Sequence, residues 1–181
     1  MKQFRSFITF SALIFTLFIV NANAQGSYKG STSVEQQVFR KIVNLPRYSV
    51  FDFITYNVNG DTVVLRGKVY SLGTKGDAAS AVKDVPGIAH VVNNIEQLPG
   101  SPYDDQIRRS LLRKFDNGGL ARYLSEIRPE MRIVVENGRV TLEGYVANKS
   151  DRNLANVYAS GVSGVFEVQN NLIVGRDSRR S

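Results

Sequence analysis

Hydrophobic and polar residues alternate in two stretches of the chain, and each stretch is interrupted by an Asn-Gly pair, Asn59-Gly60 in the first and Asn137-Gly138 in the second. Alternation with a period of two is typical of strands with one buried face. Asn-Gly favours hairpin turns because both residues tolerate positive φ. We therefore predict one β-hairpin in each half of the chain. The first turn is expected to be longer by a residue or two and to contain a bulge.

Apolar residues at helical spacing come before and after each hairpin. Before the hairpins they are Val34, Val38, Ile42 and Val43, then Ile107, Leu111, Leu112 and Phe115. After them they are Ala78, Val82 and Val85, then Ala155, Ala159 and Val162. Ser33, with Gln36 three residues later, is the expected N-cap of the first helix, and Thr74 and Ser150 are the expected caps after the hairpins. Final strands are predicted at 91–98 and 168–174.

Residues 63–98 and 140–175 are two copies of one pattern, offset by 77 positions without a gap. The repeated residues are apolar, Gly or Asn, and none is a nucleophile, an acid, a base or a metal ligand. They are Val63, Leu65, Gly67, Val69, Ala78, Val85, Gly87, Val91, Asn93 and Asn94 with their partners Val140, Leu142, Gly144, Val146, Ala155, Val162, Gly164, Val168, Asn170 and Asn171. The duplicated feature is therefore a scaffold, which favours a binding module over an enzyme.

One hairpin plus one helical crossover in each copy predicts an α+β fold of two small repeated domains. Each has the order helix, strand, strand, helix, strand, with a three-stranded mixed sheet covered by two helices on one face. The other face is expected to be open to a partner or to the sister domain. We expect the first domain at 33–98, a short Pro/Gly linker at 99–102, the second domain at 103–175 and a disordered tail at 176–181.

Residues 1–24 have the pattern of a secretory signal peptide. Lys2 and Arg5 precede an uncharged apolar run, Phe7 to Val20, which is shorter than the roughly 20 residues of a membrane-spanning helix. Ala22-Asn23-Ala24 then provides small residues for cleavage, which we expect after Ala24. An uncleaved anchor is the alternative. The prediction is export to the bacterial periplasm, and a chain without cysteine fits that compartment better than animal secretion.

Removing Lys2 and Arg5 with the leader lowers the formal net charge from +7 to +5. A mild positive surplus favours anionic surfaces such as lipid headgroups, although solubility alone also accounts for it. An exported protein rarely meets nucleic acid, so no nucleic-acid partner is predicted.

The strings "VVLRGKV", "VPGIAHVVNNI", "VTLEGYV" and "VSGVFEVQNNLIV" resemble the BON domain family, whose members are envelope modules found singly or in tandem. The resemblance covers roughly residues 33–98 and 103–175. It implies association with phospholipid or envelope structures, or a chaperone-like role under stress. It implies no catalytic residues and no cofactor.

The second copy departs from the first by inserting nine or ten residues between its first helix and its hairpin, within Asp116 to Pro129. This insert and the basic helix before it make the second domain the candidate for a specialised contact. The candidate lipid-binding residues are Arg108, Arg109, Arg113, Lys114, Arg122 and Tyr123. The alternative is a core-facing stripe with a solvated basic flank, because the first copy has a similar basic pair, Arg40 and Lys41.

The remaining polar residues do not predict a reaction centre. His90 is the only histidine and aligns with Glu167 of the other copy, so an exposed strand position is expected rather than a metal ligand. Asn93-Asn94 and Asn170-Asn171 are expected to tie their strands to neighbouring backbone, with a ligand contact as the alternative. The leading hypothesis is a membrane-peripheral adaptor for anionic phospholipid or another envelope component. A periplasmic chaperone or structural adaptor is the second, and an enzyme the third.

Overall fold

The computed structural model describes residues 33–125 and 129–175. The predicted signal peptide with its cleavage site and the predicted tail at 176–181 lie outside the described residues. Within the described ranges, no helix combines the length and the apolar composition needed to cross a bilayer.

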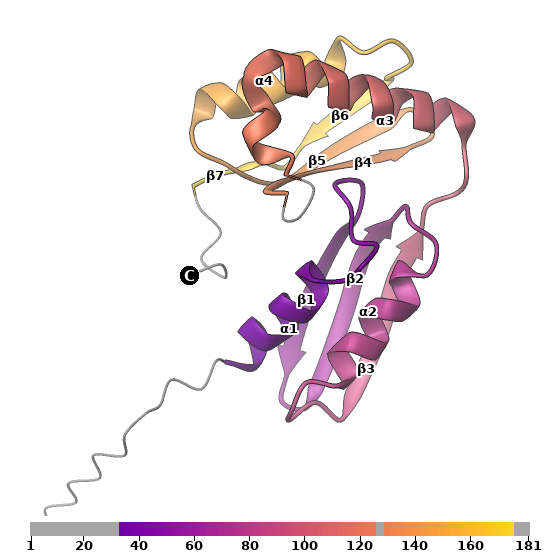
Figure 1. The fold of residues 1–181 in the computed structure, drawn as a ribbon, viewed down its shortest axis with the longest axis vertical. Coiled ribbons are helices and arrows are strands. Elements are labelled where there is room, and N and C mark those ends of the chain that lie inside the picture. Colours follow the sequence, from indigo (N-terminus) through magenta and orange to yellow (C-terminus); the bar gives the residue numbers. More distant parts are fainter. Residues whose placement is uncertain (1–32, 126–128, 176–181) are drawn as a thin grey trace, which may run out of the picture. The chain divides into compact units, whose positions relative to one another are not determined.

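Both copies have the predicted order of elements (Figure 1). The first copy contains α1 (Val34–Val43), β1 (Phe53–Asn59), β2 (Thr62–Val69), α2 (Thr74–Lys83) and β3 (His90–Gln97). The second contains α3 (Pro102–Phe115), a π-helical turn η1 (Asp116–Leu120), a 3₁₀ turn η2 (Ala121–Tyr123), β4 (Met131–Glu136), β5 (Arg139–Val146), α4 (Lys149–Ser160), β6 (Glu167–Asn170) and β7 (Ile173–Val174).

The predicted mixed sheet is confirmed in both copies. The central strand pairs antiparallel with its hairpin partner and parallel with the strand after the crossover helix, in the orders β1-β2-β3 and β4-β5-β6. The two helices of each copy cover one face of its sheet (Figure 1). One detail differs from the prediction, because the single strand expected at 168–174 is divided. β6 ends at Asn170, Leu172 turns into the core, and β7 resumes pairing with β5.

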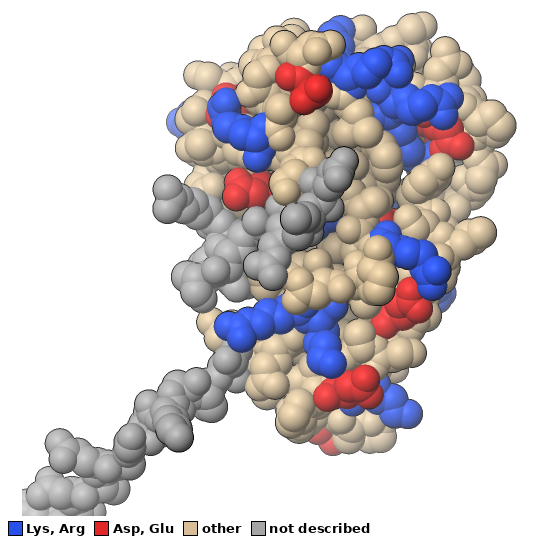
Figure 2. Space-filling view, in the orientation of Figure 1, with Lys and Arg blue, Asp and Glu red and all other residues tan. Residues whose placement is uncertain are grey.

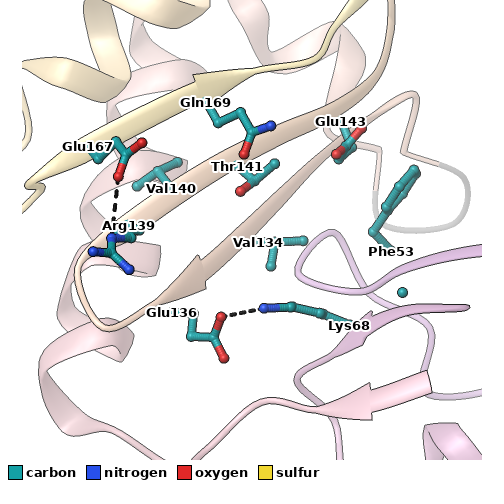
Figure 3. A pocket seen from close by; sticks show the side chains of 11 residues that line it. Phe53, Lys68, Val134, Glu136, Arg139, Val140, Thr141, Glu143, Glu167 and Gln169 are labelled. Atoms are coloured by element: carbon teal, nitrogen blue, oxygen red, sulfur yellow. Dashed lines mark hydrogen bonds and ion pairs between the residues drawn. The ribbon is translucent and has the colours of Figure 1, made fainter. Parts of the chain in front are cut away.

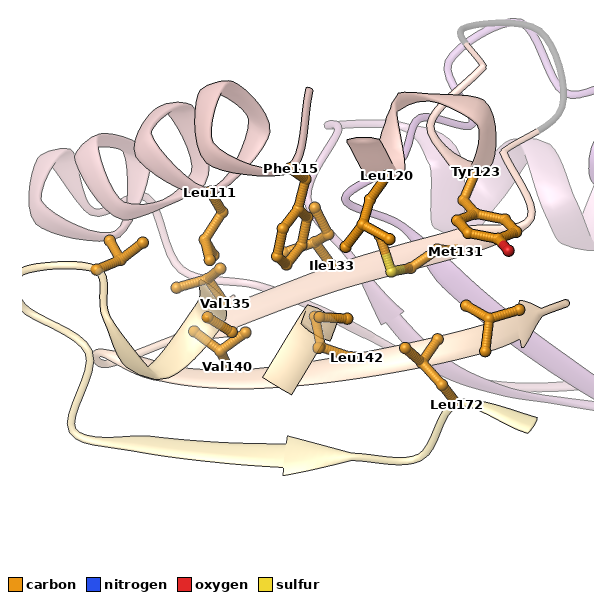
Figure 4. Close-up of a cluster of buried hydrophobic side chains, with 14 of the residues drawn as sticks. Leu111, Phe115, Leu120, Tyr123, Met131, Ile133, Val135, Val140, Leu142 and Leu172 are labelled. Atoms are coloured by element: carbon orange, nitrogen blue, oxygen red, sulfur yellow. The ribbon is translucent and has the colours of Figure 1, made fainter. Parts of the chain in front are cut away.

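The hydrophobic side chains between helices and sheet form a separate core in each copy. The first core is built around residues such as Val38, Leu65 and Val82, which are fully buried. In the second, Leu111 and Phe115 of α3 meet strand residues such as Leu142 (Figure 4). The crossover helices contribute small side chains to these cores, since Ala78, Ala155 and Ala159 are fully buried.

The insert of the second copy is part of this core. It continues α3 as η1 and η2, which carry Leu120 and Tyr123 into the apolar cluster with exposures of 0% and 3% (Figure 4). Their burial enlarges the second core beyond what the duplicated pattern provides. The specialised feature of this insert is therefore packing, at least for these two side chains.

Two local predictions were wrong. Both hairpin turns contain two residues, Gly60-Asp61 and Asn137-Gly138, so the first turn is not longer than the second. Pairing of Asn59 with Thr62 places Asn59 in the strand and moves the turn by one residue.

The capping box of Ser33 and Gln36 is confirmed. The N-cap positions of the crossover helices, however, are Gly73 and Asn148 instead of Thr74 and Ser150, and of the two only Asn148 accepts a capping hydrogen bond.

The repeated glycines Gly67 and Gly144 occupy a backbone position that no other residue fits. Their φ values are +126° and +104°, where L side chains are strained. A Cβ atom would also lie 2.0 Å from a carbonyl oxygen of the facing strand segment, that of Phe53 or of Glu130. The duplication retained glycine here because the two strands approach through the backbone.

The first copy covers the edge of β4. The Ile133 amide donates to the Val50 carbonyl at 2.8 Å, and Arg132 Nη1 donates to the Ser49 carbonyl at 2.7 Å. The Arg132 guanidinium also lies 4.2 Å from the centroid of the Tyr48 ring. A strand edge that would otherwise expose its backbone groups is thereby paired.

Candidate functional site

Helix α3 carries the candidate basic surface. Ser101 caps its N-terminus by accepting a hydrogen bond from the Asp104 amide at 3.2 Å. Ile107, Leu111 and Phe115 face the core, which leaves Arg109 and Arg113 exposed on the outer side. Figure 2 shows Lys and Arg side chains gathered over this part of the second domain. These two guanidinium groups are presented to solvent by the helical spacing alone.

Lys114 lies at the border between α3 and α4. Its Nζ donates to the Gly161 carbonyl at the end of α4, at 2.9 Å, and its side chain is half-buried. A cation suits this position because a helix C-terminus leaves carbonyl groups unpaired. Lys114 can therefore add charge to the surface, but it also holds the two helices together.

Arg108 lies inside the domain, with an exposure of 2%. Its Nη1 donates to Asp105 at 2.6 Å, its Nη2 donates to the Val135 carbonyl, and its guanidinium lies 4.3 Å from the ring centroid of Tyr70. A buried guanidinium needs such partners, because a buried charge without them is costly. In this arrangement Arg108 does not reach a ligand outside the protein.

Arg122 and Tyr123 converge on Asp151, at the start of α4. The Arg122 Nη2 and the Tyr123 hydroxyl donate to Asp151 Oδ2 at 2.7 and 2.6 Å, and the Ala147 amide donates to the same hydroxyl at 2.9 Å. The hydrogen bond from Tyr123, aided by Arg122, lowers the pKa of the Asp151 carboxyl. This network joins the insert to α4, and its buried tyrosine is a structural group.

Of the six predicted residues, α3 thus brings Arg109 and Arg113 together at the surface with Lys114 beside them. Arg108, Arg122 and Tyr123 are committed to contacts within the protein.

An exposed aromatic pair at the N-terminal end of α3 was missed by the sequence reasoning. Tyr103 and Phe166 are 46% and 78% exposed, their rings stack with centroids 6.5 Å apart, and the Tyr103 hydroxyl donates to the Gly164 carbonyl at 2.8 Å. The alignment of the two copies could have revealed it, since Phe166 of the second copy aligns with Ala89 of the first. Exposed stacked aromatic rings are expected at sites of contact with a partner or a membrane.

A second candidate site is a pocket of about 480 Å³ on the face of the second sheet opposite to its helices, here called the sheet pocket. Its floor comes from the outward-facing residues of β4, β5 and β6, such as Val134, Thr141 and Gln169, and Phe53, Gly67 and Lys68 of the first copy line its other side. Figure 3 shows Glu143 at one end of the floor and the pair of Arg139 and Glu167 at the other.

A metal centre is not found in the described ranges. No group of three or more His, Cys, Asp or Glu residues there is placed to hold a metal ion. His90 is exposed on the first residue of β3, as predicted. The repeated asparagines are structural: Asn93 and Asn170 each donate, at 2.8 Å, to a carbonyl in the first turns of the crossover helix, that of Lys75 or Arg152.

Comparison with known protein families agrees with the duplicated fold. A family model described as BON domain matches residues 31–99 and 103–176. Two solved structures of CdsD, a structural protein of the type III secretion system of Chlamydia trachomatis, are similar at 13% identity. One is a C-terminal domain, with a TM-score of 0.32 and coverage of 80% of this chain and 98% of that chain. The other has a TM-score of 0.33 and coverage of 81% and 94%. These scores are too low to support a functional inference.

No curated protein sequence matches significantly. The two family matches cover most of the chain, one on each copy of the repeat. The chain therefore belongs to the BON domain family and carries two such domains in tandem.

Proposed function

We propose that this protein is a non-enzymatic module of the bacterial periplasm that binds anionic phospholipid, or another anionic component of the envelope, through helix α3. Membership of a family associated with the cell envelope supports the compartment. The observation that carries the proposal is the surface of α3, which exposes Arg109 and Arg113 and, near its N-terminus, Tyr103 stacked on exposed Phe166.

The chemistry of this surface suits a headgroup layer. Each cation near an anionic membrane contributes about 1 kcal/mol, and aromatic rings with a polar edge favour the interfacial region. Phosphate oxygens accept hydrogen bonds from guanidinium groups in a bidentate manner, which adds geometry to the charge attraction. Binding would be peripheral, because the apolar part of this surface is a pair of rings and not a helix face.

Flotation of the mature chain with vesicles tests the proposal. We expect binding to vesicles that contain phosphatidylglycerol and little binding to pure phosphatidylcholine vesicles. R109E/R113E should weaken binding at least tenfold, given about 1 kcal/mol for each charge. R40E/K41E is the matched control, because it changes the net charge equally on the corresponding helix α1. Equal losses in both variants, or binding that ignores anionic lipid, would refute the proposal.

A role as a chaperone or structural adaptor for protein clients is the second candidate, and the edge of the first sheet favours it. β3 is the last strand of its sheet, and Val92 in its middle is 44% exposed. An edge strand offers unpaired backbone groups to an extended client segment. Suppression of client aggregation without lipid, lost on Val92→Lys, would support this function. No suppression at equal concentrations of client and protein would count against it.

A further inference from the structure

The sheet pocket contains one carboxylate without a cationic partner. Glu136 forms an ion pair with Lys68, and Glu167 forms one with Arg139 Nε at 3.3 Å (Figure 3). Glu143, at the other end of the pocket floor on β5, is in none of the ion pairs among the described residues, and its Oε1 accepts a hydrogen bond from the Asn171 amide at 2.7 Å. It is half-buried, and burial raises the pKa of its carboxyl.

The nearest cation across the hairpin does not neutralise this group. Arg132 pairs with Glu143 in the strand register, but its guanidinium lies over the ring of Tyr48 and donates to the Ser49 carbonyl. Lys68 and Arg139 are occupied by the other two carboxylates. The pocket therefore combines free volume with a carboxylate that a cation would stabilise.

The three carboxylates are not required by the fold. At the same positions of the duplicated scaffold, the first copy has Asn59, Arg66 and His90 in place of Glu136, Glu143 and Glu167. The outward face of the first sheet thus lacks these acids although its strands pair in the same way. The three acidic residues on the outward face of the second sheet are therefore specific to the second copy.

The chain itself contains a segment with complementary charge. Residues 176–181 have the sequence RDSRRS, with three arginines and one aspartate. They follow β7, which runs parallel to β5 with Val174 opposite Val146. Three residues of strand separate Val146 from Glu143, a path of about 10 Å at 3.3 Å per residue. Because β7 and β5 run in the same direction, the chain leaves β7 past Val146 and away from Glu143, so residues 176–181 would have to turn back to reach it. Six extended residues span up to about 20 Å, which exceeds the return path of about 10 Å.

We propose that the sheet pocket binds a guanidinium group, and that its occupant in the full chain is an arginine of residues 176–181. A guanidinium can donate two hydrogen bonds to one carboxylate, which suits Glu143 better than an ammonium ion does. The ring of Phe53, also in the pocket lining, offers a face on which guanidinium groups stack. Attachment to the same chain gives the segment an effective concentration in the millimolar range, which compensates for a modest affinity.

The docked segment would contact both copies, because Phe53 and Lys68 come from the first domain and Glu143 from the second. It would also leave α3 free, since the sheet pocket and the helices lie on opposite faces of the second sheet. The inference is therefore independent of lipid binding.

Titration of the Glu143 side-chain carboxyl by NMR tests the proposal in the full mature chain at low salt. Wild type is compared with R176Q/R179Q/R180Q, which removes the guanidinium groups without shortening the chain. We expect the pKa of Glu143 to be higher in the variant, because the cation that favours the ionised form is gone. The amide signals of Thr141 and Gln169 should move as well, and signals of α3 should not.

R40Q/K41Q/K83Q is the matched control, with the same loss of three charges at exposed positions of the first domain. An acetylated RDSRRS peptide added to the tail variant should restore the wild-type titration, and E143Q should weaken that peptide at least tenfold. The proposal is overturned if Glu143 titrates identically in wild type and the tail variant, or if the control shifts it equally. It is also overturned if a foreign arginine peptide binds the wild-type pocket as tightly as it binds the tail variant's pocket, because the pocket would then be vacant for a partner.

Discussion

The two copies share a backbone and differ in what they place on it. A Cβ at Gly67 or Gly144 would meet the equivalent carbonyl oxygen, that of Phe53 or Glu130, at 2.0 Å in both copies. Asn93 and Asn170 each donate an equivalent hydrogen bond to the crossover helix. The outward sheet faces, by contrast, carry different charges, and the connection from first helix to hairpin is longer in the second copy.

This difference separates two kinds of constraint. Positions identical in both copies fill the core, fit the backbone or tie strands to helices, so they are explained by the fold and do not point to a ligand. Positions that differ, such as Glu143 against Arg66 or Phe166 against Ala89, are where function can have diverged. The comparison predicts that substitutions at shared positions will cost similar amounts of stability in both copies.

The largest effect is expected for Gly67→Ala and Gly144→Ala. Each Cβ would meet a backbone oxygen at 2.0 Å, and positive φ adds strain, so each variant should lose about 3 kcal/mol or more of unfolding free energy. Gly76→Ala in α2 is the control, because a Cβ there meets nothing within 4 Å and alanine favours a helix. Denaturation in urea measures all three. A small loss of stability in one variant alone would contradict the prediction that both glycines are required for the same reason.

A contrast is expected at Thr74 and Asp151, which occupy equivalent positions. Asp151 accepts hydrogen bonds from exposed Arg122 and buried Tyr123, so Asp151→Val should cost about 3 kcal/mol by removing both bonds and the acceptor of a buried hydroxyl. The buried Thr74 hydroxyl has no partner in the described structure, so Thr74→Val should change stability by no more than about 0.5 kcal/mol. Similar losses in the two urea titrations would contradict the contrast.

Acidification should reveal the Asp151 network. Its folded pKa is lowered, chiefly by the Tyr123 hydroxyl, so its contribution is present above the unfolded pKa of about 3.9 and is lost as pH falls through the folded value. Tyr123→Phe should destabilise the protein by about 1–2 kcal/mol at neutral pH. Urea midpoints measured from pH 7 to pH 2 should show the gap to wild type narrowing in acid. A gap that stays constant would assign the effect to packing.

The smallest effect is expected for Asn93→Ala and Asn170→Ala. Each variant loses a 2.8 Å hydrogen bond to a partly solvated helix carbonyl, so about 1 kcal/mol should be lost in each copy. The neighbouring exposed Asn94 serves as control, and Asn94→Ala should be close to neutral. Thermal unfolding resolves differences of this size. A ligand role for the asparagines would be indicated if stability were unchanged in both.

Much of the fold followed from local patterns. The capping box at Ser33, the core-facing stripe of α3 and the mixed sheet around β2 and β5 were all predictable, because periodicity and capping depend on residues close in sequence. The turn after β1 was misplaced by one residue, since strand register is set by the partner strand and not by the Asn-Gly pair alone.

The candidate site was less accessible to sequence reasoning. Spacing along α3 identified Arg109 and Arg113, but it grouped them with Arg108, whose burial depends on Val135 and Tyr70, residues distant in the chain. The stack of Tyr103 on Phe166 likewise joins α3 to the approach to β6. The sequence by itself determined the repeated scaffold, because periodicity, capping and turn preferences depend on residues close together in the chain. Only the packing between segments decided which charged groups are buried, which are exposed and where the pocket lies. Burial and solvation depend on every neighbour in space, including residues far apart in the chain.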